Sequence, residues 1–279
     1  IGWCDWSSDV CSSDLKIFLT GGGTAGHIFP LIAVYREMIK NYPYAGFEFF
    51  YLGPKDSFSG PLMNQEGIRV KNILAGKFRR YFSLWNITDL VKFPLGILQS
   101  FYHIFVLSPD LILSKGGYGS IPVIIAAWVL RVPVFMHESD IVPGLANRFA
   151  SRFAVEIFIS FSINETEYFP PEKMLSVGNP IRQEILNGSE QKAQENFGLT
   201  GEKPVILVLG GSQGAQSVND KILAILPQML QDFEIIHQTG KNNFKQVEKE
   251  ARVVVPEKLR KYYHPMAFLG GDYLGHAFK

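Results

Sequence analysis

The stretch that decides the fold is "KIFLTGGGTAGHIFPLIAVYREMIK", residues 16–40. A short apolar run at 16–20 stops at three consecutive glycines, and apolar residues with helical spacing follow at 30–40. A buried strand, a glycine loop and a helix in this order are typical of α/β proteins with parallel strands. We expect the helix to begin at Pro30, because proline suits a first helical turn.

The same order of elements recurs further along the chain. Short apolar runs between turn residues predict strands at 47–53, 110–114, 133–137, 156–160 and 174–178. The run 120–130 is too long for a usual strand, and we interpret it as a buried helix. This alternation predicts a parallel sheet covered by helices on both faces.

The pattern starts again after a polar segment at 186–204. The stretch "VILVLGGSQGAQSVNDKILAILPQML" (205–230) repeats strand, glycines and helix, and 233–240 is a further strand. We therefore predict an α/β fold with two doubly wound, Rossmann-like domains, 15–181 and 182–279, the second of them incomplete.

The composition is that of a folded protein without a strong charge bias. It is 47% hydrophobic and 19% charged, with a net charge of +1, so nothing in the charge balance suggests a nucleic-acid partner. Both cysteines, Cys4 and Cys11, lie near the start of the chain, and no zinc-type spacing occurs. A reducing compartment fits this cysteine usage.

Residues 1–14 lack the basic and apolar regions of a signal peptide. They resemble a translated sequencing adapter, and we expect them to be non-native; a native disordered tail is the alternative. No run reaches the ~20 uninterrupted apolar residues of a membrane span.

The first glycine loop indicates an anion site. Gly21, Gly23 and Gly26 satisfy G-x-G-x-x-G, and free N–H groups at a helix N-terminus favour phosphate. A nicotinamide dinucleotide would need an acid at the tip of the second strand, but that strand ends "YLG" and Asp56 comes later. A tight turn without a ligand is the alternative.

His27 stands at the edge of this loop. The helix N-terminus disfavours an imidazolium, so we expect a neutral imidazole that can act as a general base. A purely structural histidine is the alternative.

Six ordered motifs then resemble one family. They are "LTGGGTAGHIFPLIAV", "SKGGYGSIPVIIAAW", "MHESDIVPGLANRFAS", "VGNPIR", "VLGGSQGAQSVN" and "HQTGK". The chain is similar to the MurG family of glycosyltransferase family 28 from about residue 15 to its end. The resemblance implies a GT-B fold, two facing domains with the site between them. It also implies inverting transfer of N-acetylglucosamine (GlcNAc) from UDP-GlcNAc to the C4 hydroxyl of lipid I, giving lipid II in peptidoglycan synthesis, without metal or cofactor.

The resemblance also implies which residues carry the site. His27 matches the base, and Glu138 would orient or assist it, with a structural hydrogen-bonding role as the alternative. Ala25 replaces the usual glycine, and Ser139-Asp140 stand where many members have Gln-Asn. The positions that match substrate contacts are Thr24, Ala25, Gly26, Tyr118, His137, Ser139, Asp140, Arg182, Ser212, Gln213 and Leu269.

Two further expectations follow from the resemblance. The chain ends before the family's segment for ribose and GlcNAc, so we expect this polypeptide to be inactive or very weak. The basic and aromatic stretch 76–105 suits an anionic membrane surface, so we expect peripheral attachment to the cytoplasmic face of the bacterial inner membrane. The alternatives are another lipid glycosyltransferase, a sugar-nucleotide epimerase, a non-catalytic nucleotide-binding remnant and, more weakly, an NAD-dependent oxidoreductase.

Overall fold

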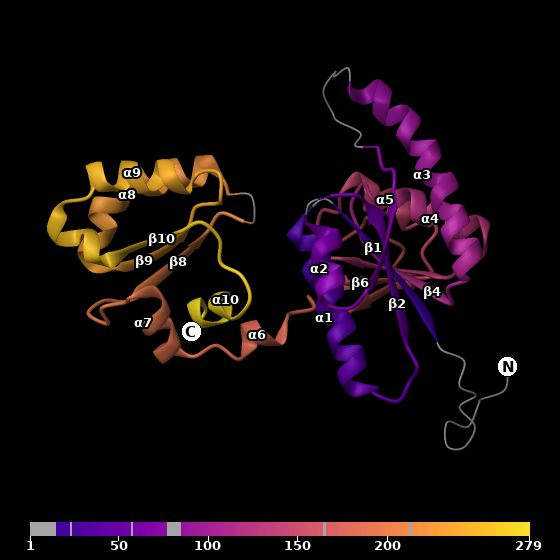
Figure 1. The fold of residues 1–279 in the computed structure, drawn as a ribbon, viewed down its shortest axis with the longest axis horizontal. Helices are drawn as coiled ribbons and strands as arrows, with labels where there is room; N and C mark the ends of the chain where they lie inside the picture. The colour runs from indigo at the N-terminus through magenta and orange to yellow at the C-terminus, as the bar shows by residue number, and fades with distance from the viewer. Residues whose placement is uncertain (1–14, 23, 57, 77–84, 164–165, 212–213) are drawn as a thin grey trace. The chain divides into compact units, whose positions relative to one another are not determined.

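The computed structural model describes residues 15–22, 24–56, 58–76, 85–163, 166–211 and 214–279. The chain divides into two compact units, Ile1–Pro180 (unit 1) and Ile181–Lys279 (unit 2), shown in Figure 1. Each unit is an α/β structure with its own sheet, as predicted.

Among its described residues, unit 1 forms a seven-stranded sheet in the order β3-β2-β1-β4-β5-β6-β7, and neighbouring strands pair in parallel. The strands are β1 (Lys16–Gly21), β2 (Glu48–Pro54), β3 (Arg69–Ile73), β4 (Leu111–Gly116), β5 (Val134–Glu138), β6 (Glu156–Ile159) and β7 (Met174–Ser176). The helices are α1 (Ala25–Asn41), α2 (Ser59–Gln65), α3 (Trp85–Leu107), α4 (Ile121–Val129), α5 (Leu145–Ala150) and the short 3-10 helix η2 (Pro171–Lys173). The strand order reverses between β1 and β4, which is where open α/β sheets bind ligands.

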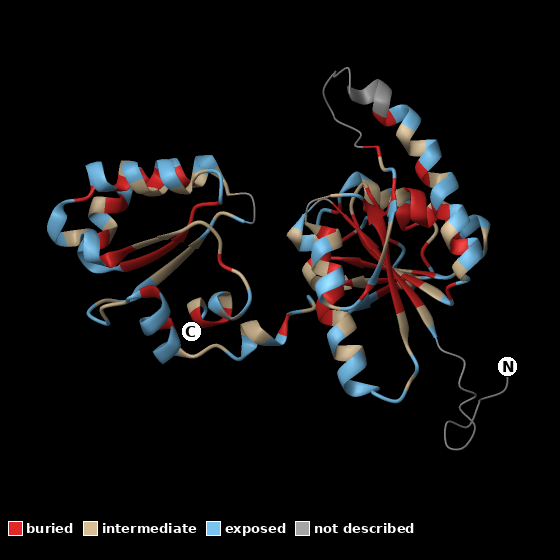
Figure 2. Cartoon of the chain, in the orientation of Figure 1, coloured by how far each residue is buried: buried red, intermediate tan, exposed pale blue. Residues whose placement is uncertain are grey.

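The alternation of side chains along β1 explains the two layers of helices. Ile17 and Leu19 belong to the buried cluster that α1 and α2 cover, whereas Phe18 belongs to the cluster of α3, α4 and α5. Figure 2 shows the buried strands between the helices. The predicted helix at 120–130 is present as α4, and Val123, Ile124, Ala126 and Ala127 in it are buried.

Several predicted boundaries differ from the structure, and two of them are informative. Helix α1 begins at Ala25, so Pro30 lies inside it and cannot donate a hydrogen bond to the Gly26 carbonyl. Strand β7 ends at Ser176, before Gly178, whose φ of +78° is incompatible with an extended strand.

Helix α3 presents much of its apolar surface to solvent (Figure 2). Its exposed residues include Leu90, Leu98 and Phe105, at 64%, 65% and 66%. Within the described residues, Asp89–Leu107 is the one helix long and apolar enough to cross a membrane, and only 17% of it is buried. Length and composition alone do not distinguish a spanning helix from one that lies on a surface. The basic residues at 77–80 lie outside the described residues.

Unit 2 has a smaller parallel sheet, with the order β10-β9-β8 in the described part of the chain. Its elements are α6 (Gln183–Leu186), α7 (Glu190–Phe197), β8 (Val205–Leu209), α8 (Gln216–Asp232), β9 (Glu234–Gln238), α9 (Phe244–Val254), η3 (Glu257–Tyr262), β10 (Tyr263–Met266) and α10 (Asp272–Ala277). Ile235 packs in the cluster of α8 and α9, and Ile236 packs in the cluster of α7 and α10. Helices therefore cover both faces of this sheet too.

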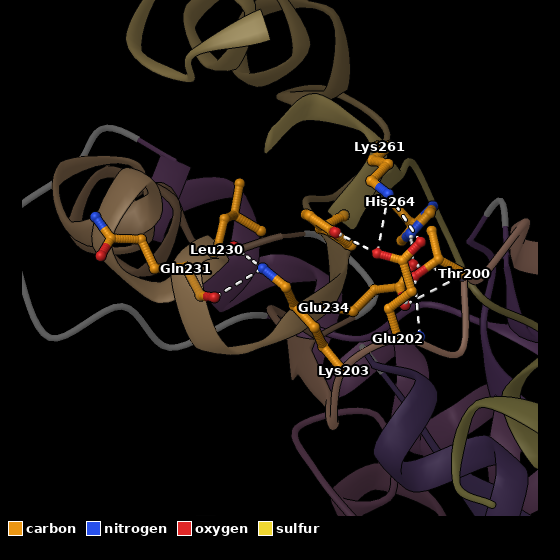
Figure 3. A network of polar contacts seen from close by, with 9 residues as sticks. Thr200, Glu202, Lys203, Leu230, Gln231, Glu234, Lys261 and His264 are labelled. Atoms are coloured by element: carbon orange, nitrogen blue, oxygen red, sulfur yellow. Dashed lines mark hydrogen bonds and ion pairs between the residues drawn. The ribbon is translucent and has the colours of Figure 1, made fainter. Parts of the chain in front are cut away.

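A buried polar network holds the amino end of β9 (Figure 3). The Glu234 carboxylate is fully buried and accepts hydrogen bonds from the Thr200 N–H at 2.9 Å and the His264 Nε2 at 2.7 Å. Lys203 donates to the carbonyls of Leu230 and Gln231, both at 2.7 Å, near the end of α8. This network lies at the opposite end of the strand from the glycine loops, so we interpret it as structural.

Candidate functional site

Two glycine loops meet at the carboxyl ends of β1 and β4. Gly21 pairs with Gly116 across the two strands. A Cβ on Gly119 would lie 2.5 Å from Pro54 Cδ, and one on Gly22 would lie 3.0 Å from Pro54 Cγ. These two glycines therefore let the loops pack against the proline at the tip of β2.

The acid that a nicotinamide dinucleotide would need is not available at this tip. Strand β2 ends in Gly53 and Pro54. The Asp56 carboxylate accepts hydrogen bonds from the backbone N–H groups of Phe58, at 2.9 Å, and Ser59, at 2.5 Å. Asp56 thus caps the start of α2, which leaves the dinucleotide interpretation without its acid.

His27 lies in the first turn of α1, and Thr24 fixes its ring. Thr24 is the N-cap residue with extended backbone, yet its hydroxyl does not cap the helix. Its Oγ1 lies 2.9 Å from His27 Nδ1 instead. A Cβ on Gly117 would lie 3.4 Å from His27 Nε2, so the glycine keeps that nitrogen clear. A base acting through Nε2 needs the tautomer in which Nδ1–H donates to Thr24.

The pKa of His27 is lowered, chiefly by burial and then by the neighbouring Lys115 cation, while Asp140 acts in the opposite direction. The imidazole is therefore neutral at pH 7 and able to accept a proton. The sequence predicted this direction from the helix N-terminus, whereas burial and Lys115 are the principal causes here.

The Glu138 carboxylate organises the loop that follows β5. It accepts hydrogen bonds from the N–H groups of Ser139 at 2.7 Å and Asp140 at 2.9 Å, and from Asn147 Nδ2 at 2.7 Å. In the described part of the chain these bonds all go to its own loop and to α5, none to His27. The geometry favours the structural role for Glu138, and Asn147 is a supporting residue that the sequence prediction missed.

His137 and Lys115 lie on the α1 side of the sheet. His137 Nε2 lies 3.0 Å from the Gly178 carbonyl oxygen, and Nδ1 has no hydrogen-bond partner among the described residues. Burial, and next the Lys115 cation, lower the pKa of His137 to about 4. Lys115 Nζ donates to Ser139 Oγ. The sequence prediction did not single out Lys115, although a lysine at the end of a buried strand is unusual.

The other predicted site residues are distributed over both units. Burial raises the pKa of Tyr118, and Asp56 and Asp89 add to that effect. Arg182 is 9% exposed before α6. Leu269 is buried, and its N–H donates to Gln238 Oε1 at 3.0 Å. Ser212 and Gln213 lie outside the described residues. Unit 1 brings together Thr24, Ala25, Gly26, His27, Tyr118, His137, Glu138, Ser139 and Asp140 at one edge of its sheet.

Sequence comparisons match this chain to one family in both units. The model of the glycosyltransferase family 28 N-terminal domain matches residues 17–159, and that of its C-terminal domain matches 205–269. A relative from Bacillus cereus is 40% identical over 228 residues, 82% of this chain and 63% of the relative. Its name is UDP-N-acetylglucosamine--N-acetylmuramyl-(pentapeptide) pyrophosphoryl-undecaprenol N-acetylglucosamine transferase 2. A similarly named relative from Lachnospira eligens is 42% identical over 226 residues, 81% of this chain and 62% of the relative.

Solved structures share the fold. MurG of Acinetobacter baumannii superposes with a TM-score of 0.60 at 22% identity, over 91% of this chain and 66% of that one. The UDP-GlcNAc 2-epimerase of Neisseria meningitidis gives 0.59 at 15% identity, over 95% and 74%. These likenesses confirm the predicted α/β fold of the GT-B type. The chain spans about 63% of the length of the curated relatives.

Proposed function

Because this chain belongs to glycosyltransferase family 28, we propose that the protein at its relatives' full length is a hexosyltransferase of peptidoglycan synthesis. It transfers GlcNAc from UDP-GlcNAc to lipid I and forms lipid II. The names of the relatives at 40% and 42% identity support this choice of donor and acceptor.

One observation carries the proposal, namely the placement of His27. Its ring is held by Thr24 at 2.9 Å, and its lowered pKa keeps it neutral. A neutral, oriented imidazole beside an uncapped helix N-terminus can accept a hydroxyl proton while the helix stabilises a nearby phosphate.

The proposed reaction follows from these parts. His27 Nε2 takes the proton of the C4 hydroxyl of the N-acetylmuramoyl unit as its oxygen attacks C1 of GlcNAc. The C1–O bond to UDP breaks, the anomeric centre inverts and UDP leaves. Thr24, Ala25 and Gly26 face the phosphates, Tyr118 lies on the acceptor side, and Ser139 and Asp140 face the donor sugar. His137 is a further substrate contact. Arg182, Ser212 and Gln213 hold the donor diphosphate, and Leu269 lies beside the uracil.

We also propose that the enzyme works peripherally on the cytoplasmic face of the inner membrane. The support is the exposed apolar surface of α3, together with the basic residues of 76–105. Lipid I is membrane-bound, so its transferase must reach that surface.

The test uses two forms, the polypeptide as given and one extended with the carboxyl-terminal residues of the Bacillus cereus relative. Both are assayed for transfer of labelled GlcNAc from UDP-GlcNAc to a short-chain lipid I. We expect turnover only in the extended form, and a loss of about 10²–10⁴-fold there on His27→Gln with unchanged UDP binding. His103→Gln, a matched change on α3, is the control.

The products separate the alternatives. An epimerised UDP-sugar would indicate an epimerase. UDP binding without turnover in the extended form would indicate a non-catalytic module. Turnover that survives His27→Gln would exclude His27 as the base.

A further inference from the structure

Lys115 sits at an irregularity in the sheet. Thr20 pairs with Ser114 and Gly21 pairs with Gly116, so Lys115 is an extra residue between two pairs of the β1–β4 ladder. Such a bulge re-aims a side chain, and bulges are over-represented beside active sites. The Lys115 side chain is held at the ligand-binding edge but is only 4% exposed.

Few protein groups compensate the positive charge of the Lys115 ammonium. Its side-chain hydrogen bond goes to Ser139 Oγ, and it forms no ion pair among the described residues. Burial lowers the pKa of Lys115, and the carboxylates of Glu138 and Asp140 act in the opposite direction. The Glu138 oxygens are already bonded to two backbone N–H groups and Asn147. Among the described residues the ammonium donates one hydrogen bond, although it carries three N–H groups, and a buried charge without a counter-charge is unfavourable.

Beside Lys115 lie a cavity and a histidine nitrogen that has no hydrogen-bond partner among the described residues. A Cβ on Gly21 would lie 3.5 Å from both His27 Cβ and Lys115 Cβ, so these two side chains start side by side. A cavity of about 290 Å³ reaches Lys115 and His137; the rest of its lining is mostly apolar, with Pro30, Leu31 and Val34 of α1, and it does not include His27. His137 is 5% exposed and its Nδ1 is unpaired, while no side chain caps the N-terminus of α1. The Nδ1 atom of His137 can only accept a hydrogen bond, because Nε2–H donates to Gly178, so the groups that fit an anion here are the Lys115 cation and the helix N–H groups.

We propose that Lys115 binds a phosphoryl oxygen of a diphosphate substrate beside His27, and that this anion is the counter-charge which the fold does not provide. The diphosphate identity rests on the proposed function. A compact ammonium with free donors suits phosphate oxygens.

The arrangement couples substrate binding to the base. Lys115 disfavours a proton on His27, and Asp140 opposes it. A bound diphosphate cancels the charge of Lys115, so His27 accepts a proton more readily when substrate is present. The empty site keeps the imidazole neutral, and the occupied site strengthens it as a base.

The test follows the histidine signals of the ¹³C-histidine-labelled chain by NMR, with inorganic pyrophosphate as the probe. The chain has six histidines, and His27→Gln assigns the signal of interest. Pyrophosphate affinity is compared among wild type, Lys115→Met, Lys115→Gln and Lys115→Arg. Lys16→Met, which removes the same charge at the opposite end of β1, is the matched control.

We expect the affinity to fall at least about tenfold in Lys115→Met and Lys115→Gln, the effect of one charge-assisted hydrogen bond. Lys115→Arg retains most of it, and Lys16→Met is unchanged. The pKa of His27 rises with pyrophosphate in wild type and is already raised in Lys115→Met without it. Equal affinity in wild type and both neutral variants, or no binding to wild type, would overturn the proposal.

UDP and geranyl diphosphate then identify the source of the diphosphate. A Lys115-dependent response to UDP indicates the donor, and one to geranyl diphosphate indicates the lipid acceptor. Binding is measured without sugar transfer, so the two proposals fail separately. Lys115-dependent binding without transfer refutes only the proposed function, and transfer with Lys115-independent binding refutes only the role of Lys115.

Discussion

Gly116→Ala is predicted to destabilise unit 1 strongly. Gly116 has φ +87°, and a Cβ there would overlap Asn147 Oδ1 and lie 2.5 Å from Asn147 Nδ2. The left-handed conformation costs a non-glycine residue about 1–2 kcal/mol. If Asn147 stays, the overlap costs about 1–3 kcal/mol; if it moves, Glu138 loses a hydrogen bond of about 1.5–3 kcal/mol. These last two are alternatives, so the total is about 2–5 kcal/mol.

Guanidinium unfolding followed by tryptophan fluorescence measures this loss. None of the four tryptophans, Trp3, Trp6, Trp85 and Trp128, lies beyond residue 180, and Trp128 belongs to α4, so a change in fluorescence follows the unfolding of unit 1 and not of unit 2. The matched control is Gly67→Ala, because Gly67 has φ +79° with nothing within 4 Å of a new Cβ. It should lose only the conformational part, about 1–2 kcal/mol. A Gly116→Ala loss within 1 kcal/mol of the control would refute the packing argument.

Three other predictions concern single residues. Thr24→Val in the extended form should lower kcat by about tenfold or more while the unfolding midpoint holds, because the His27 ring loses its hydrogen-bond partner at 2.9 Å; an unchanged kcat would contradict this. Glu234→Ala should lower the free energy of unfolding of unit 2 by about 3 kcal/mol, because the donors of Thr200 and His264 lose their acceptor. Hydrogen exchange of the β9 amides measures this loss. The control is Glu202→Ala, in the exposed pair with Lys261, which should change the exchange little. Burial lowers the pKa of His237 to about 4, so the unfolded chain binds more protons below pH 6.5 and stability falls as the pH falls. Between pH 7 and pH 5 unit 2 should lose about 2 kcal/mol from this residue, and a His237→Gln variant with the same pH dependence would disprove the assignment.

The sequence predicted the class of fold well because strand and helix periodicity are local. Residues 16–20 and 205–209 are each followed by glycines and form the first strands of the two units. The helix at 30–40 was placed too late, since proline is common at a first turn but is also tolerated at position 30, inside α1. Local sequence preference does not distinguish a proline in the first turn of a helix from a proline inside it.

The candidate site was predicted less completely. His27 and its neutral state follow from its place after the glycines, but the partners that determine its pKa come from β4 and the loop after β5. The bulge that brings Lys115 to the site depends on pairing between strands far apart in sequence. Asn147 was missed for the same reason, since it contacts Glu138 only once α5 is packed. The roles of all the candidate site residues stay predictions, those of Arg182, Ser212, Gln213 and Leu269 included.

The outer side of β8 has a practical consequence for anyone preparing this polypeptide. Among the described residues, β8 pairs only with β9, and Val205 and Leu209 are 43% and 41% exposed. An apolar edge strand with unpaired backbone groups is a template for pairing with another chain. Dilute samples and a lysine placed at Val205 should therefore keep the protein monomeric, whereas concentrated stocks of the unaltered chain should associate through this edge.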